Sequence, residues 1–505
     1  MKKTMRFLLL FLSAALLICS ISACSKPSEQ PPKQTDGEAG GENTTSGGGG
    51  NGAFVYTYGK TDYEDGTEFT FCNLNQLWDM YIYLEAPSSG NKVDKAVYSR
   101  NRLIESEMKC IIKVDERGWN YDFTPYLDAI NQAIQTDLSE WDAIWLPVNK
   151  RPDLVTMGRF RDLAEIDNLN LGSDWWDGML NSQFMLSDRL YFASSPLQLM
   201  SFDTAWGIFF NMDLIADNGM EDPRTLVKDN QWTLDKLMSM CRDNAALNGA
   251  ESYYWDKDAR QVYGIAAHPN LPDKLLYATG ERYVIKDSDD IPVYSAGGSR
   301  FVDVVGKLAR FLGADYNLEA SSNDMAADGD DIKGGGYLYA FANRRAFFMG
   351  AEIKVARQLK ALDQVVSYGL VPMPKYNDQQ QSYDTPIVES LLVMTIPVTC
   401  KREENVGAVL DALAYYSMTD VLPDYYSNIL YRGYDSADEP MFEILKKTRG
   451  VDMAYYYNWN AELAEQVRDR IFDGTGAVSD QLANAATQIP TRIATWRKTL
   501  EKLGI

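Results

Sequence analysis

Residues that could carry out covalent chemistry are few in this chain. Histidine, the side chain most often used for general acid–base catalysis, occurs once in 505 residues, as His268. Its surroundings, Ala-Ala-His-Pro-Asn, contain no pattern of a nucleophilic site, so a structural or surface role is expected. The motifs HExxH, GxSxG and GxGxxG do not occur. The sequence therefore predicts no catalytic residue and no cofactor, and the chain is not expected to be an enzyme.

Metal-ligating residues also lack a recognised spacing. The acidic stretch 323–331 does not have the spacing of an EF-hand, and a solvated loop is favoured there over a calcium site. Four cysteines follow the first 24 residues, and they are too widely separated for a zinc motif or a disulfide framework: Cys72, Cys110, Cys241 and Cys400. No metal is predicted.

Aromatic and amide side chains are what the sequence offers for binding. The chain contains 30 Tyr and 11 Trp, and its aromatic content is 12%. Aromatic rings cover the flat apolar faces of sugars, whereas Asp, Glu, Asn and Arg form hydrogen bonds with the hydroxyl groups. The formal net charge of −22 argues against nucleic acid as a partner and against electrostatic docking on an anionic membrane.

Strands alternating with helices must position these side chains. Short apolar or β-rich runs predict strands at 69–71, 110–114, 143–146 and 206–210, and helical patterns separate the first three. This order predicts a parallel α/β sheet. Thr233 is expected to cap a helix, with Trp232 packed in the core beside it. From Glu404 onward the chain is expected to be mostly helical.

The first residues form a targeting segment. Lys2, Lys3 and Arg6 precede an apolar run, 7–18, which is shorter than the ~20 residues of a membrane-spanning helix. The sequence Ile-Ser-Ala-Cys that follows resembles the lipobox of bacterial lipoproteins. This resemblance implies a signal peptide over 1–23 and an acylated Cys24, which would anchor the mature chain on the extracytoplasmic face of the cell membrane.

A polar segment rich in Gly and Ser follows the lipobox. It includes "GGENTTSGGGGNG" and cannot bury enough apolar surface to fold, so 24–66 is expected to be a flexible tether. No second apolar run reaches membrane length. Contact with the membrane is therefore expected only through the lipid.

Several motifs, in their order, carry a family resemblance. They are "WDAIWLP" with "GRFRDLAEI", then "WGIFFNMDLIADNGMEDPRT" with "QWTLDKL", then "FANRRAFFMG" and finally "YGLVPMPKY". Over about residues 67–500 the chain resembles family 1 of the extracellular solute-binding proteins, the sugar-binding proteins of ABC importers. Arg345 stands near the family's Gly-Lys position, and the gap between Pro223 and Trp232 is long. The motifs therefore do not identify the solute.

The resemblance implies a two-lobed periplasmic-binding-protein-like fold with crossing hinge strands. Lobe 1 is expected over 67–198 and 387–432, and lobe 2 over 199–386 and 433–505. The cleft between them would hold a mono- or oligosaccharide, which a monomeric protein would deliver to the permease of an ABC transporter.

Candidate ligand-binding residues are polar and aromatic side chains expected to face this cleft, most of them at strand ends. They are Asn75, Gln76, Trp78, Asn149, Arg151, Asp203, Trp206, Glu352, Tyr457 and Trp459. In a half-buried strand alternate residues face opposite ways, so Thr204 and Trp206 are expected on the cleft side.

Two other functions stay open at the level of sequence. A surface glycoside hydrolase would need two carboxylates ~5–5.5 or ~6.5–9.5 Å apart, and no local signature identifies such a pair. A binder of a non-sugar solute, such as a peptide, is the other alternative.

Overall fold

The structure is a computed structural model. It describes residues 55–75, 84–118, 122–138, 141–255, 259–319, 336–361, 366–388, 391–427, 434 and 436–504. The signal peptide, Cys24, Gln76, Trp78 and the acidic stretch 323–331 lie outside these residues.

The first sheet has the strand order β12-β3-β1-β2. Its strands are β1 (Thr67–Asn75), β2 (Cys110–Gly118), β3 (Ala143–Leu146) and β12 (Val393–Thr395). β1 is parallel to β2 and β3, whereas β12 is antiparallel to β3. The strand predicted at 143–146 is confirmed, and the one predicted at 110–114 continues to Gly118.

Helices cover this first sheet. α1 (Lys92–Met108) packs against α13 (Glu403–Tyr416) and α14 (Leu422–Tyr425). α1 begins with a capping box, in which the Asn91 side chain accepts from Asp94 N and the Asp94 side chain accepts from Asn91 N. Three further helices follow along the chain: α2 (Thr124–Gln135), α3 (Asp153–Thr156) and α4 (Gly178–Phe184).

The second sheet has the order β10-β4-β9-β5-β8. Its strands are β4 (Trp206–Asn211), β5 (Tyr263–Ala267), β8 (Leu318–Glu319), β9 (Ala346–Glu352) and β10 (Tyr368–Pro372). β5 is parallel to β8 and β9, whereas β4 is antiparallel to β9 and β10. Every residue of β4 and β5 is buried, as in a sheet covered on both faces.

Helices of the second sheet come from several parts of the chain. They are α6 (Met212–Asp217), α7 (Pro223–Lys228), α8 (Leu234–Asn244), α9 (Leu271–Ala278), α10 (Ser299–Leu312), α11 (Gly336–Ala342), α12 (Val355–Ala361) and α15 (Glu439–Lys447). The Thr233 side chain accepts from Lys236 N at the start of α8, which confirms the predicted cap. Trp232 is fully buried and donates Nε1–H to the Pro372 carbonyl, which confirms its place in the core.

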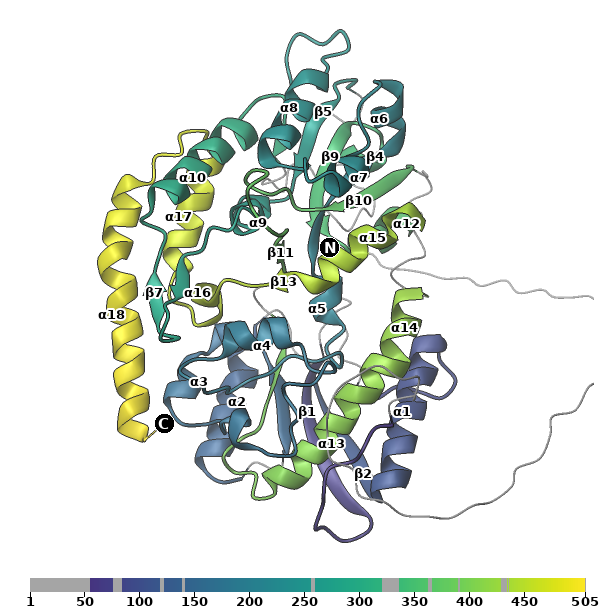
Figure 1. Ribbon diagram of the computed structural model, residues 1–505, viewed down its shortest axis with the longest axis vertical. Helices are drawn as coiled ribbons and strands as arrows, with labels where there is room; N and C mark the ends of the chain where they lie inside the picture. The colour runs from purple at the N-terminus through teal and green to yellow at the C-terminus, as the bar shows by residue number, and fades with distance from the viewer. Residues whose placement is uncertain are drawn as a thin grey trace, which may run out of the picture. The chain divides into compact units, whose positions relative to one another are not determined.

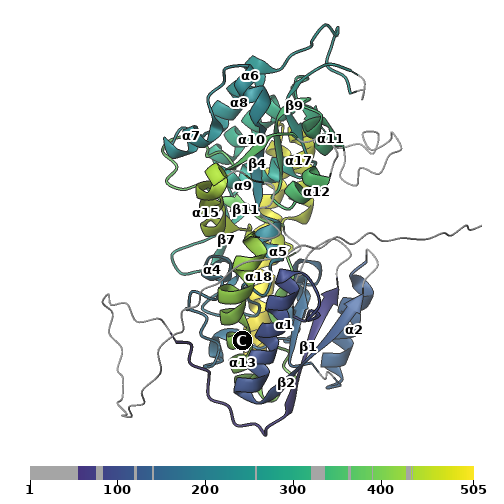
Figure 2. The same ribbon diagram turned by 90° about the vertical axis from the view of Figure 1, so that its right-hand side faces the viewer.

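The chain passes from the first sheet to the second through α5 (Met200–Asp203) and returns to the first through β11 (Thr385–Pro386). β11 pairs in parallel with β13 (Arg449–Gly450). Figures 1 and 2 show α5 and β11 between the two sheets. A β6–β7 hairpin (Val284–Lys286, Pro292–Tyr294) and α16 (Met453–Tyr456) complete this region.

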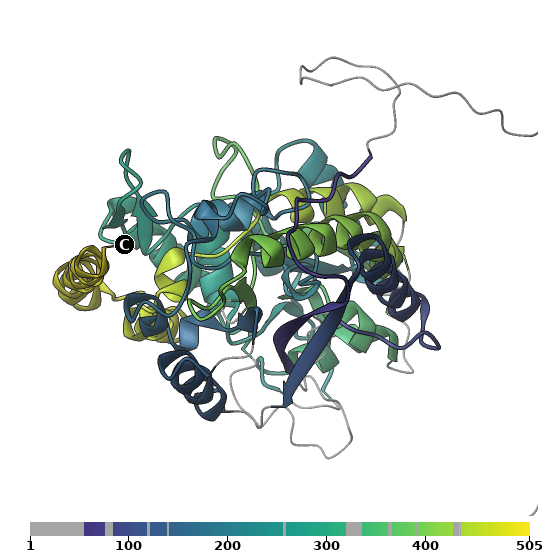
Figure 3. The same cartoon turned by 90° about the horizontal axis from the view of Figure 1, so that it is seen from below.

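Two long helices end the chain. α17 (Ala461–Phe472) packs against α9 and α10, and α18 (Ser479–Leu503) contacts α17, β7 and α3. Figures 1 and 3 both show the yellow α18 on the side of the body opposite the dark blue α1. The helical C-terminal part predicted from Glu404 onward is thereby confirmed.

The folded body begins at Tyr56, earlier than predicted. Tyr56 is 7% exposed, stacks on Tyr415 with ring centroids 4.5 Å apart, and donates its hydroxyl to Asp411. The hydroxyl of Tyr58 lies 3.0 Å from that of Tyr416. Residues 56–66 therefore belong to the body because their aromatic rings pack on α13, and the predicted tether would end before Tyr56.

None of the helices in the described part of the chain combines the length and the apolar composition that a membrane span requires. Within the same residues, no three His, Cys, Asp or Glu side chains gather in a group that could hold a metal ion.

Candidate functional site

The carboxyl edge of the second sheet is the place where this fold gathers chemically useful side chains. The parallel strands β5, β8 and β9 end there at Ala267, Glu319 and Glu352. β4 runs the opposite way and begins there, with Trp206 opposite Glu352 in the ladder. Ligands of open α/β sheets bind outside the carboxyl ends of the strands, so this edge is the first candidate for a site.

A row of three rings lies at this edge, and we refer to Trp206, His268 and Tyr337 as the edge group. The imidazole of His268 makes edge-to-face contacts with Trp206, at 5.2 Å between centroids, and with Tyr337, at 5.1 Å. Burial lowers the pKa of His268 to about 4, with the positive charges of Lys274 and Lys354 acting in the same direction. His268 is therefore neutral at physiological pH.

Charged side chains surround the edge group. Lys354 forms an ion pair with Glu352 at 2.7 Å, and the two side chains are 19% and 18% exposed. Lys274 lies with Nζ 5.6 Å from the centroid of the Trp206 ring and donates to the Ile387 carbonyl. Burial, followed by the charge of Glu352, raises the pKa of Tyr337, so its hydroxyl keeps its proton.

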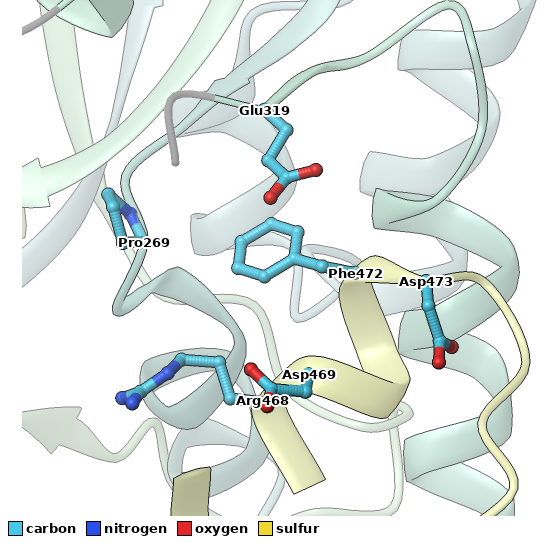
Figure 4. A pocket seen from close by; sticks show the side chains of 6 residues that line it. All are labelled: Pro269, Glu319, Arg468, Asp469, Phe472 and Asp473. Atoms are coloured by element: carbon cyan, nitrogen blue, oxygen red, sulfur yellow. The ribbon is translucent and has the colours of Figure 1, made fainter. Parts of the chain in front are cut away.

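A pocket of about 340 Å³ (Figure 4) is lined in part by Pro269, the residue that follows His268 in the chain. Its lining consists of Pro269, Glu319, Arg468, Asp469, Phe472 and Asp473. The Phe472 ring extends into the pocket beneath the Glu319 carboxylate, whereas Asp473 points away from it (Figure 4). Arg468 forms an ion pair with the buried Asp273 at 3.1 Å. The pocket thus combines one aromatic face with several carboxylates, which can accept hydrogen bonds from hydroxyl groups.

Trp206 and Glu352, two of the predicted residues, lie opposite each other at this edge. The orientation predicted for Trp206 assumed a half-buried strand. This assumption was wrong, because every residue of β4 is buried. Trp206 is 2% exposed, and its Nε1–H has no hydrogen-bond partner among the described residues. The indole supports the His268 ring from the side, and a direct contact with ligand stays a prediction.

Asp203 does not lie at a free surface, contrary to the prediction. Its carboxylate is fully buried and accepts from both terminal nitrogens of Arg357 at 3.0–3.1 Å. Burial raises the pKa of Asp203 to about 6, although the positive charge of Arg357 opposes the shift. Arg357 also donates to the Tyr425 hydroxyl of α14. Asp203 therefore ties α5 and α12 together.

The residues predicted on the first sheet lie at its carboxyl edge. Asn149 and Arg151 follow β3, and Asn149 Oδ1 is buried without a hydrogen-bond partner among the described residues. Arg151 is engaged by two carboxylates, those of Asp128 and Asp153. Asn75 is the last residue of β1; its side chain, like Gln76 and Trp78, lies outside the described residues.

Tyr457 and Trp459 are core residues rather than cleft residues, which corrects the prediction. They are 2% and 3% exposed, and their rings stack with centroids 4.9 Å apart. Tyr457 donates its hydroxyl to the Phe184 carbonyl at 2.7 Å, and Trp496 of α18 contacts both rings. We refer to Tyr457, Trp459 and Trp496 as the helix group.

Sequence reasoning missed four residues of this edge: His268, Tyr337, Lys354 and Phe472. Two signals were present, because His268 directly follows a strand and Lys354 lies two residues after the predicted Glu352. Tyr337 and Phe472 lie on helices, and only the fold brings them to this edge.

Comparisons with known proteins identify the fold. No family model matches the sequence, and no curated protein matches it. A cyclo/maltodextrin-binding protein complexed with maltotetraose has a TM-score of 0.54 and 11% identity, over 86% of this chain and 98% of that one. The galacto-N-biose-/lacto-N-biose I-binding protein of the ABC transporter from Bifidobacterium longum, in complex with lacto-N-biose, has a TM-score of 0.53 and 10% identity, over 86% and 99%.

A family 1 extracellular solute-binding protein from Bifidobacterium longum subsp. infantis has a TM-score of 0.52 and 14% identity, over 86% of this chain and 100% of that one. The chain therefore has the two-lobed α/β fold of these solute-binding proteins, and the predicted fold class is confirmed.

Proposed function

We propose that this chain binds a carbohydrate at the carboxyl edge of its second sheet and delivers it to the permease of an ABC transporter. One observation carries the proposal: the edge group lies next to a charged pair, Glu352 and Lys354, and the residue after His268 lines an open pocket with an aromatic wall. Aromatic faces together with a small number of polar groups are what sugar recognition requires.

The size and chemistry of the pocket support this proposal. Ligand pockets of small molecules have volumes of roughly 300–1,000 Å³, and this one has about 340 Å³. Glu319 and Asp469 are acceptors for hydroxyl groups, and Phe472 offers an apolar face. A mono- or oligosaccharide presents both kinds of surface, whereas an extended peptide would need a longer groove.

The fold supports transport as the context. Two structural neighbours were solved with lacto-N-biose and with maltotetraose bound, and one of them is named as part of an ABC transporter. Fold alone does not determine function, so the residues of the edge must supply the specificity for a sugar. Chain passages between two sheets, such as those at α5 and β11, suit a hinge that closes around a ligand.

The N-terminal sequence supports a location at the cell surface. In this proposal the signal peptide 1–23 is removed, Cys24 carries the lipid, and the body is held on the extracytoplasmic face as a monomer. Replacing Cys24 with Ser should move the full chain from the detergent phase to the aqueous phase in phase partitioning. Equal partitioning of the two chains would contradict the lipid anchor.

Binding is tested by measuring thermal shifts of the full chain with a panel of mono- and oligosaccharides. A ligand that binds only the folded state raises the melting temperature, and titration calorimetry of the hits gives affinities. Chromatography of the same mixtures separates the alternatives, because a glycoside hydrolase releases products and a binding protein returns its ligand intact. A panel of short peptides tests the non-sugar alternative.

Glu352→Gln is the variant that tests the place of binding. Removing a charged acceptor should weaken affinity for the best glycan about tenfold, since hydrogen bonds to charged groups contribute ~1.5–3 kcal/mol. The matched control is Glu443→Gln, which breaks a similar ion pair, with Lys446 at 2.8 Å, on α15. Equal affinities for both variants would place the ligand elsewhere.

A further inference from the structure

The contacts of His268 restrain the orientation of its ring at the edge. This residue is the chain's one histidine, it directly follows β5, and its ring contacts both Trp206 and Tyr337. Two edge-to-face contacts restrain the plane of an imidazole more firmly than one. The direction of its ring nitrogens is therefore restrained as well.

The hydrogen bonding of His268 selects one tautomer. The backbone N–H of Asn270 donates to His268 Nδ1 at 3.0 Å. A nitrogen that accepts a hydrogen bond carries no proton, so the proton of the neutral ring is on Nε2. Among the described residues, the hydrogen bond of the His268 ring is the one at Nδ1. His268 Nε2–H is thus a donor without a partner in the described part of the chain.

Charges on the neighbouring elements favour this neutral form. Lys274 of α9, Lys354 after β9 and Arg468 of α17 all oppose a positive charge on the ring. The nearby carboxylates are already engaged, Glu352 by Lys354 and Asp273 by Arg468. The neighbours on β4 and α11, Trp206 and Tyr337, carry no charge at neutral pH. The ring therefore donates as neutral imidazole rather than as imidazolium.

We propose that His268 donates Nε2–H to an uncharged acceptor oxygen of the bound ligand and so selects ligands that carry a hydroxyl or ether oxygen at that point. The proposal rests on carbohydrate binding at this edge and adds the group that reads one oxygen of the sugar. A fixed donor left unpaired disfavours an analogue that lacks the acceptor, because the N–H covered by the ligand would then lose its hydrogen bond to water without replacement.

Two variants separate the donor from the ring. His268→Phe keeps an aromatic ring against Trp206 and Tyr337 and removes the donor, so affinity for the best glycan should fall about tenfold. His268→Gln places an amide N–H near the position of Nε2 and should stay within about threefold of the wild type. Melting curves of both variants confirm that the comparison is made on folded protein.

Nuclear magnetic resonance of the full chain labelled with ¹⁵N-histidine gives an independent readout, because one histidine gives one pair of ring nitrogens. The expected result is a protonated Nε2 at neutral pH and a shift of that resonance on addition of the glycan. A protonated Nδ1, or normal affinity of His268→Phe, would overturn this proposal and leave carbohydrate binding intact. A wild-type chain that binds no glycan would overturn both.

Discussion

The edge group and the helix group contain similar rings in different surroundings. Each contains a tryptophan and a tyrosine. In the edge group both rings contact His268, whereas in the helix group the two rings contact each other. Tyr457 and Trp459 stack nearly parallel, at 19° between planes, and join the last helix to the rest of the body. The edge group meets at 77° and 80° around one imidazole.

An unpaired indole nitrogen does not distinguish the two groups. Trp206 and Trp496 both bury Nε1 without a partner among the described residues. Charged neighbours do not distinguish them either: Lys274, Glu352 and Lys354 surround the edge group, whereas Arg492 donates to the Trp459 carbonyl and Arg497 lines a pocket with Trp496. The difference lies in the imidazole of His268, which both other rings of the edge group contact. Aromatic content therefore does not by itself distinguish a packed core from the site proposed at the edge, and the histidine is the feature that only the edge group has.

Replacing Trp206 with Ala should have the largest total effect. The loss of a buried indole should lower the free energy of unfolding by ~3–5 kcal/mol, as for other large-to-small core substitutions. The same change removes the lateral support of His268, so affinity in the folded fraction should fall about 30-fold. Denaturant unfolding and calorimetric titration measure the two effects. Normal affinity of the folded fraction would place Trp206 in the core alone.

Replacing Trp459 with Ala should affect stability only. The expected loss is again ~3–5 kcal/mol in the free energy of unfolding, because the ring stacks on Tyr457 and contacts Trp496 in the core. Affinity of the folded fraction for the best glycan should equal that of the wild type. A selective loss of affinity would restore the predicted role of Trp459 in binding and remove the distinction between the two groups.

Acid should destabilise the edge group through His268. The pKa of this ring is about 4 in the folded state, against an ordinary value of 6.5, so the unfolded chain binds the proton first. Stability from this residue is therefore lost as pH falls from about 6.5 to about 4, by on the order of 3 kcal/mol.

The measurement compares wild type with His268→Phe, because other groups titrate in the same range. Burial raises the pKa of Asp203 and of Asp452 to about 6, and both therefore favour the folded state as pH falls. Their effect is common to both chains and cancels in the difference. If the difference in unfolding free energy between the two chains did not change between pH 7 and pH 4, the His268 ring would take up its proton equally well in the folded and the unfolded state.

Local signals made part of this fold predictable. The run 143–146 and the cap at Thr233 depend on a few adjacent residues, and both were predicted correctly. Burial of Trp206 was not predictable from its own strand, because it depends on β9 and β10 on either side and on helices over both faces. A pairwise alternation rule cannot show whether a strand is central in its sheet.

The site was predictable only where a strand ends. Trp206 and Glu352 were predicted at strand ends, and the structure places them opposite each other. Asp203 was predicted in the same way, but its partner Arg357 is 154 positions away, and no local pattern indicates such an ion pair. His268 was assigned a structural or surface role because Ala-Ala-His-Pro-Asn contains no nucleophilic pattern, and its ring neighbours come from distant parts of the chain.

The smallest effects come from two Tyr→Phe substitutions that remove one oxygen from each group. Tyr457→Phe loses the buried hydrogen bond to the Phe184 carbonyl, so the free energy of unfolding should fall by about 1 kcal/mol with affinity unchanged.

Tyr337→Phe keeps the ring against His268 and loses a hydroxyl that has no hydrogen-bond partner among the described residues. Its stability should change by less than about 0.5 kcal/mol. If this hydroxyl faces the ligand, affinity should fall about two- to fivefold. Chemical denaturation and calorimetry on the two variants therefore give opposite patterns, one in stability and one in affinity. The same pattern for both variants would mean that the edge group, like the helix group, only packs.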